Sequence, residues 1–165
     1  MIKKIVMLAT LTNFLLLACQ NNPKTVKAEN QTKRTGENQN EAKPTNISFT
    51  LAKNYFVQNT VEKLDNPKIE TAEKFNEIFG MATTMGKDGK PTEIDFSKHY
   101  VIAFILPETD LSTSVSPICL LKTGNEITLH YKSVVGQKQS WTTRPNFAII
   151  IDKKDNGNVL LKEIK

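Results

Sequence analysis

The sequence has 165 residues, and its 22 Lys and Arg against 17 Asp and Glu give a formal net charge of +5. Most of this excess precedes Ile47, because residues 47–165 carry a net charge of only +1. A nearly neutral domain lacks the basic surface that nucleic-acid binding requires, so no nucleic-acid partner is expected.

The N-terminus has the parts of a bacterial export signal. Lys3 and Lys4 precede an apolar run from Ile5 to Leu17, which is shorter than the roughly 20 residues that a membrane-spanning helix needs. The run ends in Leu16-Leu17-Ala18-Cys19, which resembles the bacterial lipobox. That resemblance implies a signal peptide at residues 1–18, cleavage before Cys19, and a lipid on the thiol of Cys19. The alternative is an ordinary secretion signal with a chance cysteine.

A tether is expected after the lipidated cysteine. Residues 20–46 contain no aromatic side chain and are mainly Asn, Gln, Lys, Glu, Thr and Pro, so they bury too little apolar surface to fold. We therefore expect residues 19–46 to link a lipid anchor to one folded domain at residues 47–165. Because Gln20 rather than Asp follows Cys19, the likeness to lipoproteins implies the outer membrane rather than the inner membrane. Periplasmic and surface-exposed positions both stay open.

The first half of the domain predicts a strand and then a helix. Residues 47–57 alternate apolar and polar side chains and then become aromatic, which predicts a strand with a bulge near Lys53-Asn54. Thr71 can cap a following helix and Gly80 can end it. The expected buried face of this helix consists of Ala72, Phe75, Ile78 and Phe79.

An unbroken apolar run at residues 100–106 predicts a central strand covered on both faces, which Pro107 ends. Two turn sequences, Thr123-Gly124-Asn125 and Asp155-Asn156-Gly157, predict hairpins in the second half of the domain. The strands expected to pair across them are 118–122 with 126–133, and 147–152 with 159–164. About six strands and one helix in this order predict an α+β domain with a mostly antiparallel sheet. A small open barrel is the alternative.

Residues that could carry catalysis are few. His130 alternates with apolar neighbours and is expected to face solvent, and His99 lies at the start of the apolar strand. No His or Cys spacing fits a zinc site, so neither a metal nor a cofactor is expected. Cys119 is the remaining thiol once Cys19 is acylated, and its apolar neighbours favour burial. The alternative is a reactive thiol that pairs with one of the two histidines.

The strongest candidates for binding are Trp141 and Arg144. They are the only Trp and the only Arg of the domain, and they are expected to lie between two strands. Trp and Arg are enriched where interfaces concentrate their binding energy. Packing at one end of the core by Trp141, with a merely solvated Arg144, is the alternative. A second candidate is the Thr- and Ser-rich stretch 107–116, predicted to be a loop that forms a binding rim.

Several short motifs carry a family likeness: Phe75-Asn-Glu-Ile-Phe79, Ile94-Asp-Phe-Ser-Lys98, Tyr100-Val-Ile-Ala-Phe104 and Arg144-Pro-Asn-Phe-Ala148. Together they resemble small envelope lipoproteins of Gram-negative anaerobes, and their order is similar to the C-terminal domain of the protease complex subunit PrcB. The chain departs from that pattern at residues 107–116, where a glycine-rich segment is missing. The resemblance implies an accessory role and carries no catalytic residue over to this chain.

The first hypothesis from these observations is that the chain is a non-enzymatic, membrane-tethered domain that binds another envelope protein. The second hypothesis is a small-ligand or glycan-binding lipoprotein that uses Trp141 as a stacking platform. The third is a thiol-dependent enzyme that uses Cys119.

Overall fold

The computed structural model describes residues 42–86 and 88–165. The predicted signal peptide, Cys19 and the tether up to residue 41 therefore lie outside the described residues. The described residues belong to a unit that spans Asn38–Lys165. Its elements, in chain order, are β1 (Thr45–Ile47), β2 (Thr50–Leu51), β3 (Tyr55–Val57), β4 (Lys68–Ile69), α1 (Ala72–Ile78), β5 (Phe79–Met81), β6 (His99–Ile105), β7 (Thr109–Thr123), β8 (Glu126–Thr143), β9 (Asn146–Asp152), the 3₁₀ turn η1 (Lys153–Asp155) and β10 (Asn158–Glu163).

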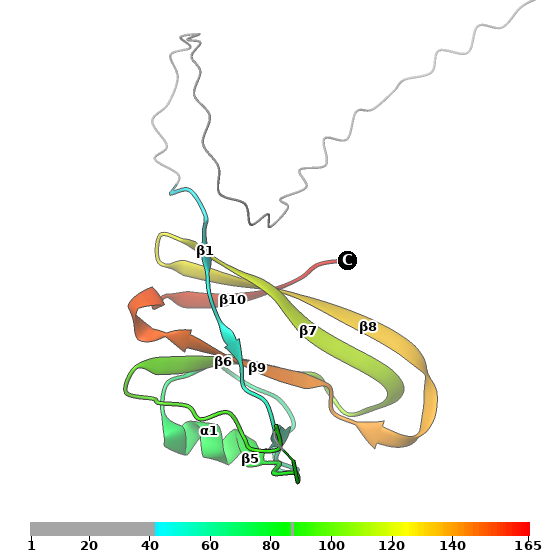
Figure 1. Ribbon diagram of the computed structural model, residues 1–165. Coiled ribbons are helices and arrows are strands. Elements are labelled where there is room, and N and C mark those ends of the chain that lie inside the picture. The colour runs from blue at the N-terminus through cyan, green and yellow to red at the C-terminus, as the bar shows by residue number, and fades with distance from the viewer. Residues whose placement is uncertain (1–41, 87) are drawn as a thin grey trace, which may run out of the picture. The chain divides into compact units, whose positions relative to one another are not determined.

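Two four-stranded sheets pack on one another in this part of the chain (Figure 1). The first sheet has the strand order β1-β7-β8-β10, and the second has the order β2-β9-β6-β4. α1 and the β3–β5 hairpin cover the other face of the second sheet. All strand pairs are antiparallel except that of β10 with β8. The prediction of mostly antiparallel strands with one packed helix is thus confirmed, and α1 is the one α-helix of the described residues. The ten strands of the described residues form three sheets, whereas one sheet of about six strands was expected.

β6 lies inside the second sheet and is buried on both faces. Tyr100 and Ile102 belong to the core between the two sheets, whereas Val101 and Ala103 belong to the core beneath α1. All four side chains are fully buried. This double burial explains why the run at residues 100–106 has no polar position, and it confirms the predicted central strand.

The predicted strand at residues 47–57 is instead three short strands in three different sheets. β1 pairs with β7, β2 with β9, and β3 with β5. Asn54 interrupts the run with a φ of 61°, and its side-chain amide donates a hydrogen bond of 2.8 Å to the Lys90 carbonyl. Because β1 begins at Thr45, the last two residues assigned to the tether belong to the domain.

α1 begins as predicted and ends differently. The Thr71 hydroxyl accepts a hydrogen bond of 3.2 Å from the Lys74 N–H, which caps the helix. The helix stops before Phe79, whose extended backbone starts β5, so Gly80 lies within a strand instead of ending the helix. The ring of Phe56 lies over Gly80 and would clash with any Cβ there, which explains the glycine.

One of the two predicted hairpins is correct. β7 and β8 are joined through Gly124, whose φ of 59° suits a tight turn. The hairpin predicted at Asp155-Asn156-Gly157 is wrong, because β9 and β10 belong to different sheets and β10 pairs in parallel with β8. Asn156 has a φ of −69°, which is incompatible with the predicted turn. The segment η1 crosses between the sheets, and the Tyr100 hydroxyl donates a hydrogen bond of 3.1 Å to the Asp155 carbonyl there.

Burial of Tyr100 should make the fold sensitive to alkali. Burial, together with the charges of Asp155 and Glu70, raises the pKa of the Tyr100 hydroxyl to about 12, above its unfolded value of about 10. The stability contributed by neutral Tyr100 is complete below pH ~10 and is lost as the pH rises toward the folded pKa. We expect the melting temperature to fall over this range, and to fall less in a Tyr100→Phe variant, as measured by circular dichroism. An equal fall in both proteins would contradict this assignment.

Candidate functional site

The outer parts of β7 and β8 form a two-stranded extension, residues 109–114 and 134–143, which we call the arm. β1 pairs with β7 only at residues 120–122, and β10 pairs with β8 only at residues 126–131. Within the described residues, the strands of the arm therefore have only each other as partners. Figure 1 shows the arm at the right, curving away from the part of the sheet that β1 and β10 complete.

Unequal strand lengths produce the curvature of the arm. Between the pairs Thr109↔Thr143 and Thr113↔Val135, β8 advances eight residues while β7 advances four. The additional residues of β8 form bulges, and bulges bend and twist a ribbon. At the bend, a Cβ added to Gly136 would lie 2.7 Å from the Ser112 carbonyl oxygen, so the two backbones approach closely there.

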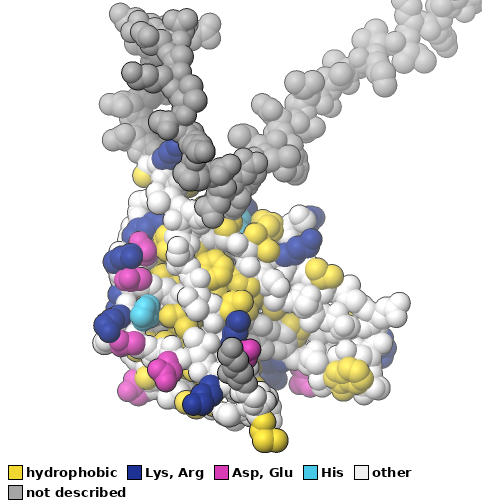
Figure 2. Space-filling model, in the orientation of Figure 1, with side chains coloured by type: hydrophobic (Ala, Val, Ile, Leu, Met, Phe, Trp, Pro, Cys, Tyr) yellow, Lys and Arg dark blue, Asp and Glu magenta, His cyan; other side chains and the backbone are white. Residues whose placement is uncertain are grey.

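The surface of the arm is apolar in places and poor in charge. Leu111, Val134, Val135 and Trp141 are exposed, and the exposed fraction of Trp141 is 63%. The charged groups of the arm are Asp110 and Lys138, which form an ion pair of 2.8 Å with each other. The other arm residues are Ser, Thr, Gln and Gly. In Figure 2 this region is mostly white with yellow groups, in contrast to the densely charged opposite side of the molecule.

Two expectations about this region need correction. Residues 107–116 do not form a loop, because β7 begins at Thr109 and runs through the Thr- and Ser-rich stretch. Trp141 lies within β8 rather than between strands. Sequence reasoning therefore identified Trp141 as a candidate but missed Val134 and Val135, which join it on a shared ribbon. One signal could have revealed the arm: residues 108–116 contain neither glycine nor proline, the residues that usually mark a loop.

Arg144 follows β8 at the end of the arm where its two strands lead into β6 and β9, which we call the base of the arm, and its side chain is only 19% exposed. One terminal nitrogen donates hydrogen bonds to the carbonyls of Val61 and of Gln58, the latter at 3.4 Å. The other lies 3.7 Å from one carboxylate oxygen of Glu108, and the second carboxylate oxygen of Glu108 accepts a hydrogen bond from the Thr142 hydroxyl. Arg144 thus joins the segment at residues 58–61 to both strands where the arm begins.

Arg144 also lines a hollow of about 380 Å³ together with Phe56, Glu108, Asn146 and the arm residues Thr142 and Thr143. Trp141 is not among its lining residues. The structure therefore places the two predicted binding residues in different surroundings: Trp141 is exposed on the arm, and Arg144 is largely enclosed at its base.

The close approach at Gly136 gives a test of the arm geometry. Gly136→Ala should push β8 away from Ser112 and loosen the arm without disturbing the buried strand β6. We expect hydrogen exchange of the arm amides to become about tenfold faster, with exchange in β6 unchanged. Ser114→Ala, at an exposed arm position, serves as the control. Unchanged exchange in Gly136→Ala would show that the bend tolerates a side chain.

Two of the three catalytic candidates, Cys119 and His130, lie opposite each other on paired strands. Cys119 is buried and is the register partner of His130 in the β7–β8 ladder, next to the bulge at Ile118. His130 is partly buried, and burial together with the charge of Lys162 lowers the pKa of its imidazole. His99 lies apart from them at the start of β6, where its ring nitrogen lies 3.1 Å from the Asp95 carbonyl. The fold therefore brings Cys119 into register with His130 and not with His99.

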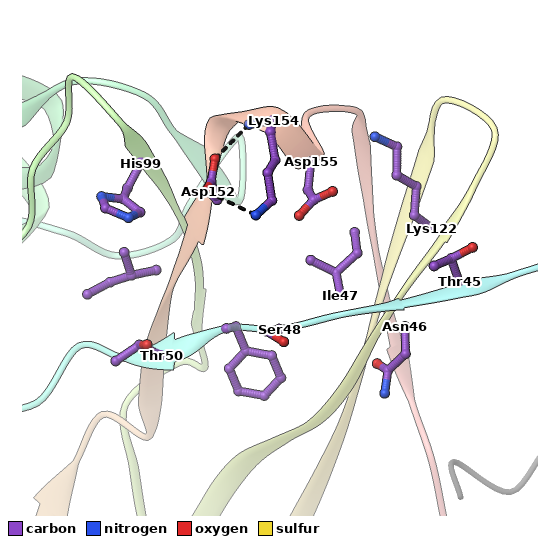
Figure 3. Close-up of a pocket in the computed structure, with 12 residues that line it drawn as sticks. Thr45, Asn46, Ile47, Ser48, Thr50, His99, Lys122, Asp152, Lys154 and Asp155 are labelled. Atoms are coloured by element: carbon purple, nitrogen blue, oxygen red, sulfur yellow. Dashed lines mark hydrogen bonds and ion pairs between the residues drawn. The ribbon is translucent and has the colours of Figure 1, made fainter. Parts of the chain in front are cut away.

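A polar pocket of about 420 Å³ lies where the chain crosses from β1 to β2 (Figure 3). In Figure 3, His99, Asp152, Lys154, Asp155 and Lys122 lie above the β1–β2 segment, which lines the lower side of the pocket. The ammonium group of Lys154 lies 3.4 Å from a carboxylate oxygen of Asp152. The pKa of the Asp152 carboxyl is lowered, mainly because this carboxyl accepts a hydrogen bond from the backbone N–H of Lys154. Sequence reasoning missed this pocket because its residues come from four separate segments.

Two features are absent from the described residues. Residues 42–86 and 88–165 contain no group of three or more His, Cys, Asp or Glu side chains arranged to hold a metal ion. In the same ranges, no helix has both the length and the apolar character needed to span a membrane. The predicted lipidation site at Cys19 precedes these ranges and stays a prediction.

Comparison of the chain with protein-family models, curated proteins and solved structures gives no match.

Proposed function

We propose that this chain is a lipid-anchored protein of the bacterial envelope whose domain is a non-enzymatic module that binds another protein through the arm. The anchor rests on the lipobox-like sequence that ends at Cys19. Binding rests on one observation: of the ten large apolar side chains that are exposed in the described residues, four lie on the arm. They are Leu111, Val134, Val135 and Trp141.

The character of the arm supports protein binding. The core of a protein–protein interface is depleted in charged residues and enriched in aromatic ones, and the arm combines one exposed Trp with a single mutually paired Asp and Lys. A two-stranded ribbon alone is only marginally stable, so a partner that packs against it would also stabilise it. Its polar Ser, Thr and Gln side chains would supply hydrogen bonds around the apolar contacts.

Site-specific photo-crosslinking in the producing bacterium would test the proposal. A photoreactive amino acid at Val135, which is 62% exposed, should give a discrete adduct with one envelope protein. The matched control is Met81, which is 67% exposed but lies on β5 away from the arm. The same adducts from both positions, or none from Val135, would contradict binding through the arm.

A second candidate function is favoured by the polar pocket. Its lining contains two lysines, Lys122 and Lys154, and two aspartates, Asp152 and Asp155, so their formal charges cancel. Hydroxyl groups of the β1–β2 segment also line the pocket. Such a lining suits a small neutral ligand rich in hydroxyl groups, such as a glycan. Trp141 is not part of this pocket, so a ligand there would not use it as a stacking platform. Titration with sugars, followed by NMR shifts of the residues that line the pocket, would separate this function from protein binding.

A further inference from the structure

β10 leaves one edge of the first sheet open. It is the last strand in the order β1-β7-β8-β10, and it pairs with β8 along all six of its residues. The N–H of Asn158 donates to the Asn125 carbonyl at 2.8 Å, and the N–H of Ile164 donates to the Tyr131 carbonyl at 2.8 Å. Because backbone groups alternate in direction along a strand, the even-numbered residues of β10 bond to β8.

The odd-numbered residues of β10 therefore point their backbone groups away from the sheet. Val159, Leu161 and Glu163 each present one N–H and one C=O in this direction, and no backbone partner for these groups occurs among the described residues. Unpaired groups in a row are a template for another strand. The occupant of this edge should consequently be an extended backbone.

The side chains of β10 indicate which strand fits. Val159 and Leu161 pack against the core between the sheets, while Leu160 lies on the opposite face and is 50% exposed. A cluster of charges usually protects an exposed edge from pairing, but the stretch from residue 158 to 161 has none. The first charged residue is Lys162.

We propose that a second copy of this chain occupies the edge, with its own β10 antiparallel to the first about a twofold axis at Leu160. A twofold axis perpendicular to the sheet keeps each face on the same side, so only residues of the same parity can lie opposite one another. Centred on Leu160, Val159 of each copy lies opposite Leu161 of the other, and Asn158 lies opposite Lys162. Every apolar side chain then meets an apolar one.

The neighbouring symmetric registers are poorer. Centred on Leu161, the pairing sets Lys162 against Leu160 and Glu163 against Val159, so each charge faces an aliphatic group. Centred on Lys162, it sets two like charges directly opposite, which is destabilising. In every symmetric register the odd-numbered residues form the hydrogen-bonded pairs, which satisfies their outward N–H and C=O groups, so the side chains decide between the registers.

The test is the mass of the full-length chain in solution, measured by sedimentation across a dilution series. Cys19→Ser in every protein removes the proposed lipid, so the outcome does not depend on the proposed anchor. The parent is expected to be a dimer. Leu160→Lys would place two cations on the twofold axis and should weaken the dimer by about 100-fold. Leu51→Lys is the matched control, because Leu51 is an exposed leucine on the edge strand β2 and should leave the dimer intact.

A second pair of variants isolates the backbone. Leu161→Pro removes an outward N–H that no ladder bond to β8 uses, whereas Leu161→Ala loses packing but keeps that N–H. The proline variant should be monomeric and the alanine variant dimeric, with both folded by circular dichroism. A monomeric parent at all concentrations, or a dimer that Leu160→Lys and Leu51→Lys weaken equally, would overturn the proposal. A monomer that instead binds a strand of another protein at β10 would overturn it as well.

Discussion

Trp141→Ala is expected to weaken binding of the partner by at least about 30-fold, which corresponds to the 2 kcal/mol that defines an interface hot spot. Trp141 is the largest exposed side chain of the arm, and truncating it removes apolar area that only a partner would cover. Because the side chain is 63% exposed, the free energy of unfolding should change by less than about 0.5 kcal/mol. Titration calorimetry with the cross-linked partner and urea denaturation would measure the two effects.

Met81→Ala provides the control for Trp141→Ala. Met81 is also a large exposed apolar residue, at 67%, but it lies on β5 and does not line the hollow beside the arm. Its removal should leave the affinity for the partner unchanged. Equal losses of affinity in both variants would mean that the partner does not recognise the arm specifically.

Arg144→Ala is expected to lower the free energy of unfolding by about 2–3 kcal/mol. Its guanidinium group donates to the backbone carbonyls of residues 58 and 61. Removing it takes this donor from the Val61 carbonyl, whereas the Gln58 carbonyl keeps the N–H of Val61 at 3.0 Å. Arg144→Lys should lose most of the same stability, because one ammonium cannot reproduce the planar set of donors. Urea denaturation monitored by circular dichroism checks both variants.

The matched control for Arg144 is Lys138, a cation of the arm that pairs with Asp110 in solvent. Lys138→Ala should cost less than about 1 kcal/mol, since exposed ion pairs contribute little. Loss of affinity without loss of stability in Arg144→Ala would show instead that Arg144 contacts the partner directly.

Burial on two faces made the centre of the fold predictable. A strand with both faces covered must be apolar along its covered part, so β6 was visible after His99 as the unbroken apolar run that starts at Tyr100. The cap of α1 at Thr71 was equally local, because the donor and the acceptor lie three residues apart. The mostly antiparallel α+β class followed from the same short-range patterns.

The errors arise where distant partners decide the structure. Asn156-Gly157 resembles a tight turn that would pair β10 with β9. Instead β10 pairs with β8, and no pattern in the neighbouring sequence indicates that pairing. The arm was hidden because both of its faces are open to solvent, which removes the apolar alternation of a half-buried strand. The structural role of Arg144 was hidden because the carbonyls that it binds lie 83 and 86 residues away in sequence, so Arg144 was taken for a binding residue.

The parallel pairing of β10 with β8 also sets the order in which the chain can fold. The first sheet is complete only when β10 has been made, and the second only when β9 has been made. β1 cannot pair until β7 has been made, because Thr45 lies opposite Lys122. Contacts of such long range make folding slow. A chain that leaves the ribosome from its N-terminus therefore stays unfolded until almost all of it has been made. That delay would suit the export that we propose for this protein, because an export channel accepts an unfolded chain.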